Sequence, residues 1–168
     1  AEAGYVHSQG DLNWWMPDGQ MFYSPNELDT SAQELAYAGE HFFLPCRYAD
    51  PFNHTTHVRY DAYDLLVLET EDPVHNKVTA GERTPEGAIT PGLDYRVLQP
   101  ALLSDPNRNR SAAAFSALGL VVGNALMGKP SESVGDSLAG FSADLPPLVA
   151  QAHLANPFLN PELILQQA

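Results

Sequence analysis

The chain has 168 residues, 44% of them hydrophobic, which fits one domain with enough apolar surface for a core. Eight Lys and Arg against 21 Asp and Glu give a formal net charge of -13, which argues against nucleic acid and anionic lipid as partners. The single cysteine, Cys46, excludes an internal disulfide and a cysteine-based zinc site.

The fold class expected from the sequence is mainly β, because 14 prolines and 12 glycines divide the apolar residues into short runs. Residues 5–25 hold two aromatic-rich runs around a Pro-Asp-Gly turn at 17–19, which predicts a β-hairpin. The acidic segment 29–38 precedes Gly39 and predicts a short helix. Residues 41–48 predict a strand that Pro45 interrupts or confines to a sheet edge.

Three turns then share an Asp-Pro pattern, beginning at Asp50, Asp72 and Asp105, with Asn or His four residues after each Asp. We expect the Asp side chain to accept hydrogen bonds from its own turn, Pro to fix φ, and the Asn or His to occupy the left-handed region. Such repeated antiparallel hairpins predict a sheet that grows by stacking. Strands are predicted at 55–60, 77–80 and 110–115, with further apolar runs at 65–68 and 118–123.

From residue 129 the composition changes, and leading prolines predict short helices near 146–154 and 161–168. The apolar segment that runs to Ala168 leads us to expect that the natural protein continues beyond it. The predicted organisation is one fragment, with an aromatic hairpin and connector (1–49), a repeat region (50–128) and a helical and loop segment (129–168).

Residues 56–66 and 114–122 resemble the YD repeats of RHS-type proteins, in which a turn, a strand, a Tyr-Asp pair, a bend and another strand follow one another. The wider context at 22–25, 94–100 and 105–110 resembles the B component of bacterial insecticidal toxin complexes and the related SpvB-like toxins. The repeat signature residues in this chain are Tyr60, Asp61, Phe115 and Gly119. It departs from the pattern where Ser116 replaces the repeat Asp, and where Asn53, His75 and Arg108 replace a turn Gly.

The resemblance implies a strip of hairpins in a hollow shell that encloses a cytotoxic cargo, without catalysis or a cofactor of its own. It implies the rest of the shell and the cargo as partners, in a bacterial, secreted or exported toxin. We expect aromatic and Leu/Val runs inside, acids outside, and self-association through exposed strand edges. No apolar run reaches the length of a membrane span, and residues 1–5 lack signal-peptide features.

Three histidines offer an alternative with metal chemistry. His54 and His57 lie three residues apart, His75 follows in the next turn, and carboxylates lie nearby. Imidazole and carboxylate groups suit zinc or another divalent ion. Residues three apart on a strand point to opposite faces, so these rings converge only if the turn bends between them. Surface and turn positions are the plainer interpretation.

Gly-Asp-Ser-Leu at 135–138 spells the motif of an esterase class, with Ser137 as the nucleophile. The later His153 has Ala150, and not Asp, three residues before it, and a polar loop precedes the motif; a helix-capping role is the alternative. Cys46 lies beside Arg47, whose charge favours a thiolate, and His41 is five residues away; a buried structural cysteine is the alternative.

Trp14 and Trp15 are candidates to stack on a sugar ring, or to fill and flank a core. Beside the leading hypothesis of a structural shell segment, two others stay open. One is a small hydrolase, metal-assisted through the three histidines or serine-based through Ser137. The other is a carbohydrate- or partner-binding module that uses the two tryptophans.

Overall fold

The computed structural model describes residues 5–7, 10, 12–16, 18–159 and 161–162. The chain divides into two compact units, Ala1–Ala80 and Gly81–Ala168. All the strand pairs among the described residues are antiparallel, which confirms the mainly β prediction. Within the same residues, no helix is both long and apolar enough to cross a membrane.

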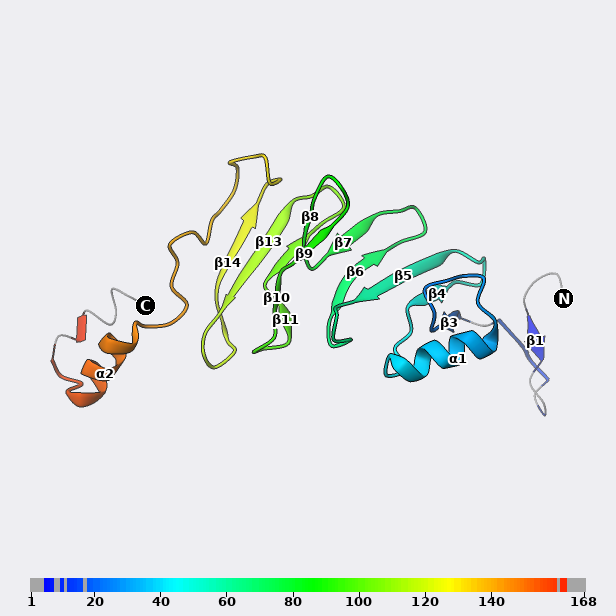
Figure 1. Ribbon diagram of the computed structural model, residues 1–168, viewed down its shortest axis with the longest axis horizontal. Coiled ribbons are helices and arrows are strands. Elements are labelled where there is room, and N and C mark those ends of the chain that lie inside the picture. Colours follow the sequence, from blue (N-terminus) through cyan, green and yellow to red (C-terminus); the bar gives the residue numbers. More distant parts are fainter. Residues whose placement is uncertain (1–4, 8–9, 11, 17, 160, 163–168) are drawn as a thin grey trace. The chain divides into compact units, whose positions relative to one another are not determined.

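The first unit combines a strand ladder with one helix (Figure 1). Its elements are β1 (Val6–His7), β2 (Trp14–Trp15), β3 (Gln20–Phe22), α1 (Ser31–Glu40), β4 (Arg47–Ala49), β5 (Thr55–Tyr60), β6 (Val67–Glu71) and β7 (Lys77–Thr79). The ladder runs in the order β7-β6-β5-β4-β3, so consecutive strands are neighbours, while β1 and β2 form a separate pair. Residues of α1 hydrogen-bond the chain beside β3 and β4.

The second unit also consists of antiparallel strand pairs, several of them with strands of only two or three residues. Its elements are β8 (Gly81–Arg83), β9 (Ile89–Pro91), β10 (Leu93–Asp94), β11 (Gln99–Pro100), β12 (Leu102–Ser104), β13 (Arg110–Phe115), β14 (Val121–Met127) and α2 (Pro147–Ala155). β8 pairs with β9, β10 with β11, and β13 lies between β12 and β14. The strands predicted after the three Asp-Pro turns are therefore present as β5, β7 and β13.

Two of the three predicted helices are confirmed, each within two residues. A capping box at Thr30 and Gln33 begins α1, because each side chain bonds the backbone amide of the other residue. Proline occupies the first turn of α2, where its missing N–H costs nothing. Of the helix predicted at 161–168, residues 161–162 are helical and 163–168 lie outside the described residues.

The hairpin predicted within 5–25 is wrong in its pairing. The tryptophans of β2 pair with β1, whereas β3 pairs with β4, which begins 25 residues after β3 ends. The backbone of β4 approaches so closely that a Cβ at Gly19 would lie 3.0 Å from the Ala49 carbonyl oxygen. Residues 18–19 therefore join two separate pairs and do not close a hairpin; Pro17 lies outside the described residues.

The strand predicted over 41–48 is shorter than expected, because its first half closes helix α1. Phe42 and Phe43 have φ values of 54° and 56°, and the Phe43 N–H donates to the Ala38 carbonyl oxygen at 2.8 Å. This left-handed pair ends the helix in the way a glycine normally does. The strand begins only at Arg47, after the proline.

The expected separation of apolar residues inside and acids outside is wrong. Large side chains on the strands and turns are exposed, including Leu118 at 86% and Phe42 at 74%. The buried apolar residues are mostly small, apart from Leu68 and Phe115, and they lie together with buried polar ones: Ser24, Arg47, Asp61, Glu69, Thr79 and Ser104. Each of these polar residues except Glu69 lies on or near the end of a strand, where hydrogen bonds satisfy its polar groups; Glu69 accepts a bond from Thr79 Oγ1 at 2.9 Å.

Candidate functional site

The three Asp-Pro turns share one hydrogen-bond pattern. In each, the amide of the fourth residue donates to the Asp carbonyl, and the Asp amide donates to the carbonyl of the fifth residue, all at 2.9–3.0 Å. One carboxylate oxygen of each Asp also accepts from the amide of the fifth residue, at 2.7–2.9 Å. The prediction that Asp50, Asp72 and Asp105 hold their own turns is confirmed.

The left-handed residue of these turns lies one position earlier than expected. Asn53, His75 and Arg108, the fourth residues, have φ values of 64°, 67° and 68°. Asn and His tolerate this region, whereas a long side chain such as Arg is uncommon there. The fifth residue, Asn or His, does not reverse the chain: in each turn its backbone hydrogen-bonds the turn Asp.

The lowered pKa values of the three turn aspartates make these turns sensitive to acid. The pKa of Asp50 is lowered, first by the His54 N–H, and the pKa values of Asp72 and Asp105 are lowered first by the side-chain amides of Asn76 and Asn109. A lowered folded-state pKa means that stabilisation is complete above the unfolded value of about 3.9 and is lost as pH falls through the lower folded values.

We therefore expect acid to destabilise the protein partly through these three carboxylates. Replacing all three with Asn keeps an oxygen acceptor but removes the titration, so the fall in urea midpoint from pH 5 to pH 2.5 becomes smaller than in the wild type. Parallel urea titrations at the two pH values measure this. An equal fall in both proteins would contradict the assignment.

A second kind of turn lies at the Tyr60-Asp61 signature. Asp61 is 6% exposed, and its Oδ1 accepts hydrogen bonds from the amides of Leu65 and Leu66, each at 2.8 Å. Its own amide donates to the Leu66 carbonyl at 2.9 Å, and Asp64 takes the left-handed position with φ 55°. The Asp61 carboxylate thus holds the connection between β5 and β6.

The connection between β13 and β14 is a related turn that is one residue shorter and has a weaker acceptor. Ser116 replaces Asp, and its Oγ accepts from the Leu120 amide at 3.3 Å. The Ser116 amide donates to the carbonyl of Leu120, four residues on, whereas Asp61 bonds the residue five positions on; Gly119, with φ 79°, donates back to the Ser116 carbonyl, and both bonds of Ser116 are 2.9 Å long. Phe115, which ends β13 as Tyr60 ends β5, is 7% exposed.

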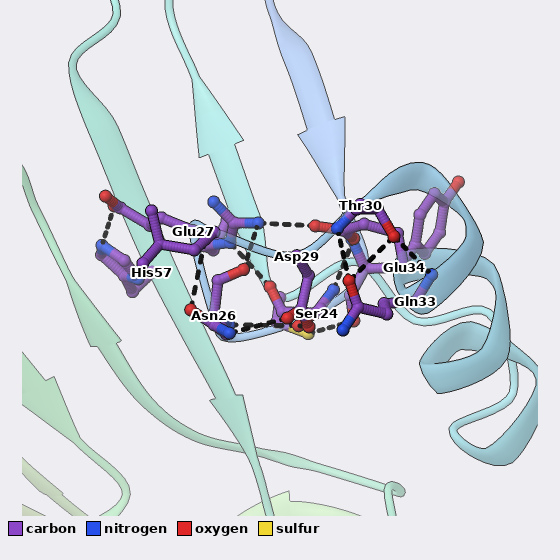
Figure 2. A network of polar contacts seen from close by, with 12 residues as sticks. Ser24, Asn26, Glu27, Asp29, Thr30, Gln33, Glu34 and His57 are labelled. Atoms are coloured by element: carbon purple, nitrogen blue, oxygen red, sulfur yellow. Dashed lines mark hydrogen bonds and ion pairs between the residues drawn. The ribbon is translucent and has the colours of Figure 1, made fainter.

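A buried arginine organises the polar network beside α1 (Figure 2). Arg47 is 4% exposed; its Nε donates to the Ser24 carbonyl at 2.6 Å and its Nη2 to Glu34 Oε1 at 2.6 Å. The other Glu34 oxygen accepts the amides of Tyr23 and Ser24. The guanidinium also lies 4.6 Å from the centre of the Phe22 ring. This network fixes α1 and the loop after β3 against β4.

Asp29 extends the network shown in Figure 2 toward the start of α1. It accepts the hydroxyl of Ser24 and, at 2.6 Å, the side-chain amide of Asn26. No sequence pattern predicts this network, although the Thr-x-x-Gln spacing at Thr30 indicates where the helix begins.

The three candidate metal histidines are not brought together. Each lies beside a different carboxylate. The ring-to-carboxylate distances are 3.0 Å for His54 and Asp50, 3.7 Å for His57 and Glu27, and 2.7 Å for His75 and Glu71. Over the described residues, no group of three His, Cys, Asp or Glu side chains is placed to hold a metal ion.

Cys46 and His41 have separate partners as well. The buried Cys46 thiol donates to the Tyr23 carbonyl at 2.7 Å, and burial, then the negative charge of Glu34, raises its pKa despite the opposing effect of Arg47. A raised pKa keeps the thiol protonated, which makes it a poor nucleophile. His41 instead pairs with Asp64 at 2.8 Å and stacks on Tyr37.

The Gly-Asp-Ser-Leu motif closes the outer edge of β14. The Asp136 amide donates to the Leu126 carbonyl at 2.7 Å, and its carboxylate accepts the Leu126 amide at 3.2 Å. Gly135 has φ 98°, and a Cβ there would lie 2.3 Å from the Leu126 oxygen. Ser137 Oγ accepts the Ala139 amide at 3.0 Å, and among the described residues it makes no hydrogen bond to His153 on α2.

Replacing Gly135 with Ala is expected to lower the free energy of unfolding by about 2 kcal/mol or more, because the left-handed backbone and the contact with Leu126 both oppose a side chain. Ser137→Ala is the matched control and should change stability by less than about 0.5 kcal/mol. Urea denaturation measures both. A larger effect for Ser137→Ala than for Gly135→Ala would contradict the structural role of this motif.

The two tryptophans lie on β2 with 68% and 53% of their surfaces exposed. Adjacent strand residues point to opposite faces, so Trp14 and Trp15 do not form one flat platform. Trp14 instead contacts the ring of His7 edge-on, at 5.1 Å between centroids.

No protein-family model matches the sequence, and no curated protein matches it either. Solved structures do match in fold. Over 87% of this chain, at 21% identity and a TM-score of 0.56, the fold is similar to a chain in the crystal structure of TcdB2-TccC3-Cdc42. Over 90% of it, at 21% identity and a TM-score of 0.54, it is similar to a chain in the structure of TcdB2-TccC3-TEV. This chain spans about 6% of the length of those chains.

Proposed function

We propose that this chain is a structural β-repeat segment in the wall of a toxin-complex shell that encloses a cytotoxic cargo, with no catalysis of its own. The observation that carries the proposal is the recurrence of two turn plans along the chain. One is built on Asp50, Asp72 and Asp105, and the other on Asp61 and Ser116. A strip made of such hairpins extends by adding equivalent units.

The similarity in fold to chains of TcdB2-TccC3 structures supports a toxin-associated role. In this proposal the partners are neighbouring segments of the shell and the enclosed cargo, and the protein is a bacterial toxin component that is secreted. Strand edges at the ends of the strip are available for pairing, so the separate chain self-associates at high concentration. A sedimentation profile that stays monomeric at every concentration would contradict this last part.

A broad hydrolase screen, run with and without added divalent ions, tests the proposal against the enzymatic alternatives. The screen uses ester, peptide and glycoside substrates on the purified wild type and on Ser137→Ala and His54→Ala. A structural segment gives no turnover above the buffer rate in any of them. Turnover in the wild type that either substitution abolishes would overturn the proposal.

A further inference from the structure

A depression of about 480 Å³ opens on the sheet of the first unit, within the volume range of ligand pockets. Its floor is a row of cross-strand neighbours, Met21 on β3, Tyr48 on β4 and Thr56 on β5. Side chains alternate along β4, so this row lies on the face opposite the buried Arg47. Met21 is 57% exposed and Tyr48 38%, which leaves a thioether and an aromatic surface open to a ligand.

The walls of the depression supply negative charge. Asp18 comes from the segment before β3, Asp50 and His54 from the first Asp-Pro turn, and Pro73 from the next. Asp50 is already engaged by His54 and by its own turn. Asp18 makes no hydrogen bond or ion pair with another described residue, and no Lys or Arg lines the depression. One carboxylate is therefore available to a cation.

We propose that this depression binds an arginine side chain from an extended peptide. A guanidinium group stacks on an aromatic ring such as Tyr48 and pairs with a carboxylate such as Asp18, while its aliphatic stem lies along Met21. The ladder of the first unit ends at β3 on this side, over the described residues, so the peptide backbone can add to that edge. The net charge of -13 attracts a basic segment.

Calorimetric titration of the purified chain at low salt tests the proposal with capped hexapeptides. The peptide Thr-Arg-Thr-Arg-Thr-Arg is expected to bind and its Thr-Glu counterpart not to bind. N-acetylarginine amide is expected to bind at least about tenfold more weakly than the Arg peptide, because it cannot pair along β3. Asp18→Asn and Tyr48→Leu are each expected to weaken peptide binding by roughly two- to fivefold.

Two controls keep these outcomes specific. Glu40→Gln removes the same charge from an exposed position on α1 and should leave the affinity unchanged. Tyr48→Phe keeps the aromatic face and should retain binding even if Tyr48→Leu fails to fold. The site is overturned if the Arg peptide does not bind at millimolar concentration, or if Glu40→Gln weakens binding as much as Asp18→Asn does. If N-acetylarginine amide bound as tightly as the Arg peptide, the claim that the peptide backbone pairs with β3 would be overturned.

Discussion

Replacing Arg47 with Met is expected to lower the free energy of unfolding of the first unit by about 3–5 kcal/mol, the typical cost of breaking a buried ion pair from one side. The substitution leaves the largely buried Glu34 carboxylate without its cation, leaves the carbonyl oxygen of Ser24 without its guanidinium donor, and leaves that of Asn26 with only the Asp29 amide. These losses fall together on the loop that joins β3 to α1. The apolar side chain of Met does not replace any of these bonds.

Urea denaturation followed by circular dichroism measures this effect, with Arg59→Met as the matched control. Arg59 lies exposed on neighbouring β5, so its loss should change stability by no more than about 0.5 kcal/mol. The double variant Arg47→Met with Glu34→Gln should recover part of the loss, because no unpaired charge then stays buried. Equal effects of Arg47→Met and Arg59→Met would contradict the role given to the network.

Replacing Asp61 with Ala is expected to cost about 2–3 kcal/mol, because two amides of the β5–β6 connection lose their acceptor. Asp61→Ser should cost less, about 1 kcal/mol, since Ser116 shows that a hydroxyl accepts one of these bonds in the equivalent turn. The order of stability expected is therefore wild type, then Ser, then Ala. Thermal and urea unfolding establish the order.

Asp18→Ala is a suitable control for this series, because Asp18 is exposed and its removal changes the net charge equally. A stability change for Asp18→Ala beyond about 0.5 kcal/mol would show that charge, and not the turn, dominates. If Asp61→Ser proved as costly as Asp61→Ala, the two turns would not be equivalent. The repeat would then be a similarity of sequence without a shared mechanism.

The turns were the part of the fold that the sequence predicts best. Asp-Pro fixes a turn through hydrogen bonds within five residues, so a short sequence pattern at Asp50, Asp72 and Asp105 is enough to predict each turn. The strands that follow each turn are predictable for the same reason, because they depend on residues close in the sequence. The error within these turns, the position of the left-handed residue, arises because Arg108 occupies a conformation that long side chains rarely adopt.

Pairing at a distance was not predictable in the same way. The whole of α1 lies between β3 and β4 in the sequence, and contacts across that connection stabilise the pair, among them Arg47 with Glu34 and Cys46 with Tyr23. No sequence pattern indicates that Arg47 is buried; from the sequence it is only a cation beside Cys46. The hydrogen-bond partners of the candidate catalytic groups were not predictable either: Ser137 accepts the Ala139 amide, Cys46 donates to the Tyr23 carbonyl, and His54 lies beside Asp50.

Both kinds of turn use aspartate as an acceptor of backbone hydrogen bonds. This use accounts for four of the 21 acids, Asp50, Asp61, Asp72 and Asp105, because a carboxylate satisfied by amides needs no countercharge. It also explains why exposed Leu and Phe side chains coexist with buried polar ones: hydrogen bonds and not a large apolar core hold the connections together.

Protease protection of the cargo measures the central claim most directly. The proposal places this chain in a longer polypeptide, in which trypsin should leave the enclosed segment intact while the wall is folded. Arg47→Met and Asp61→Ala should open the wall and expose the cargo at temperatures where Arg59→Met still protects it. A cargo that trypsin digests equally in the wild type and in all variants would contradict the role of this chain as a shell wall.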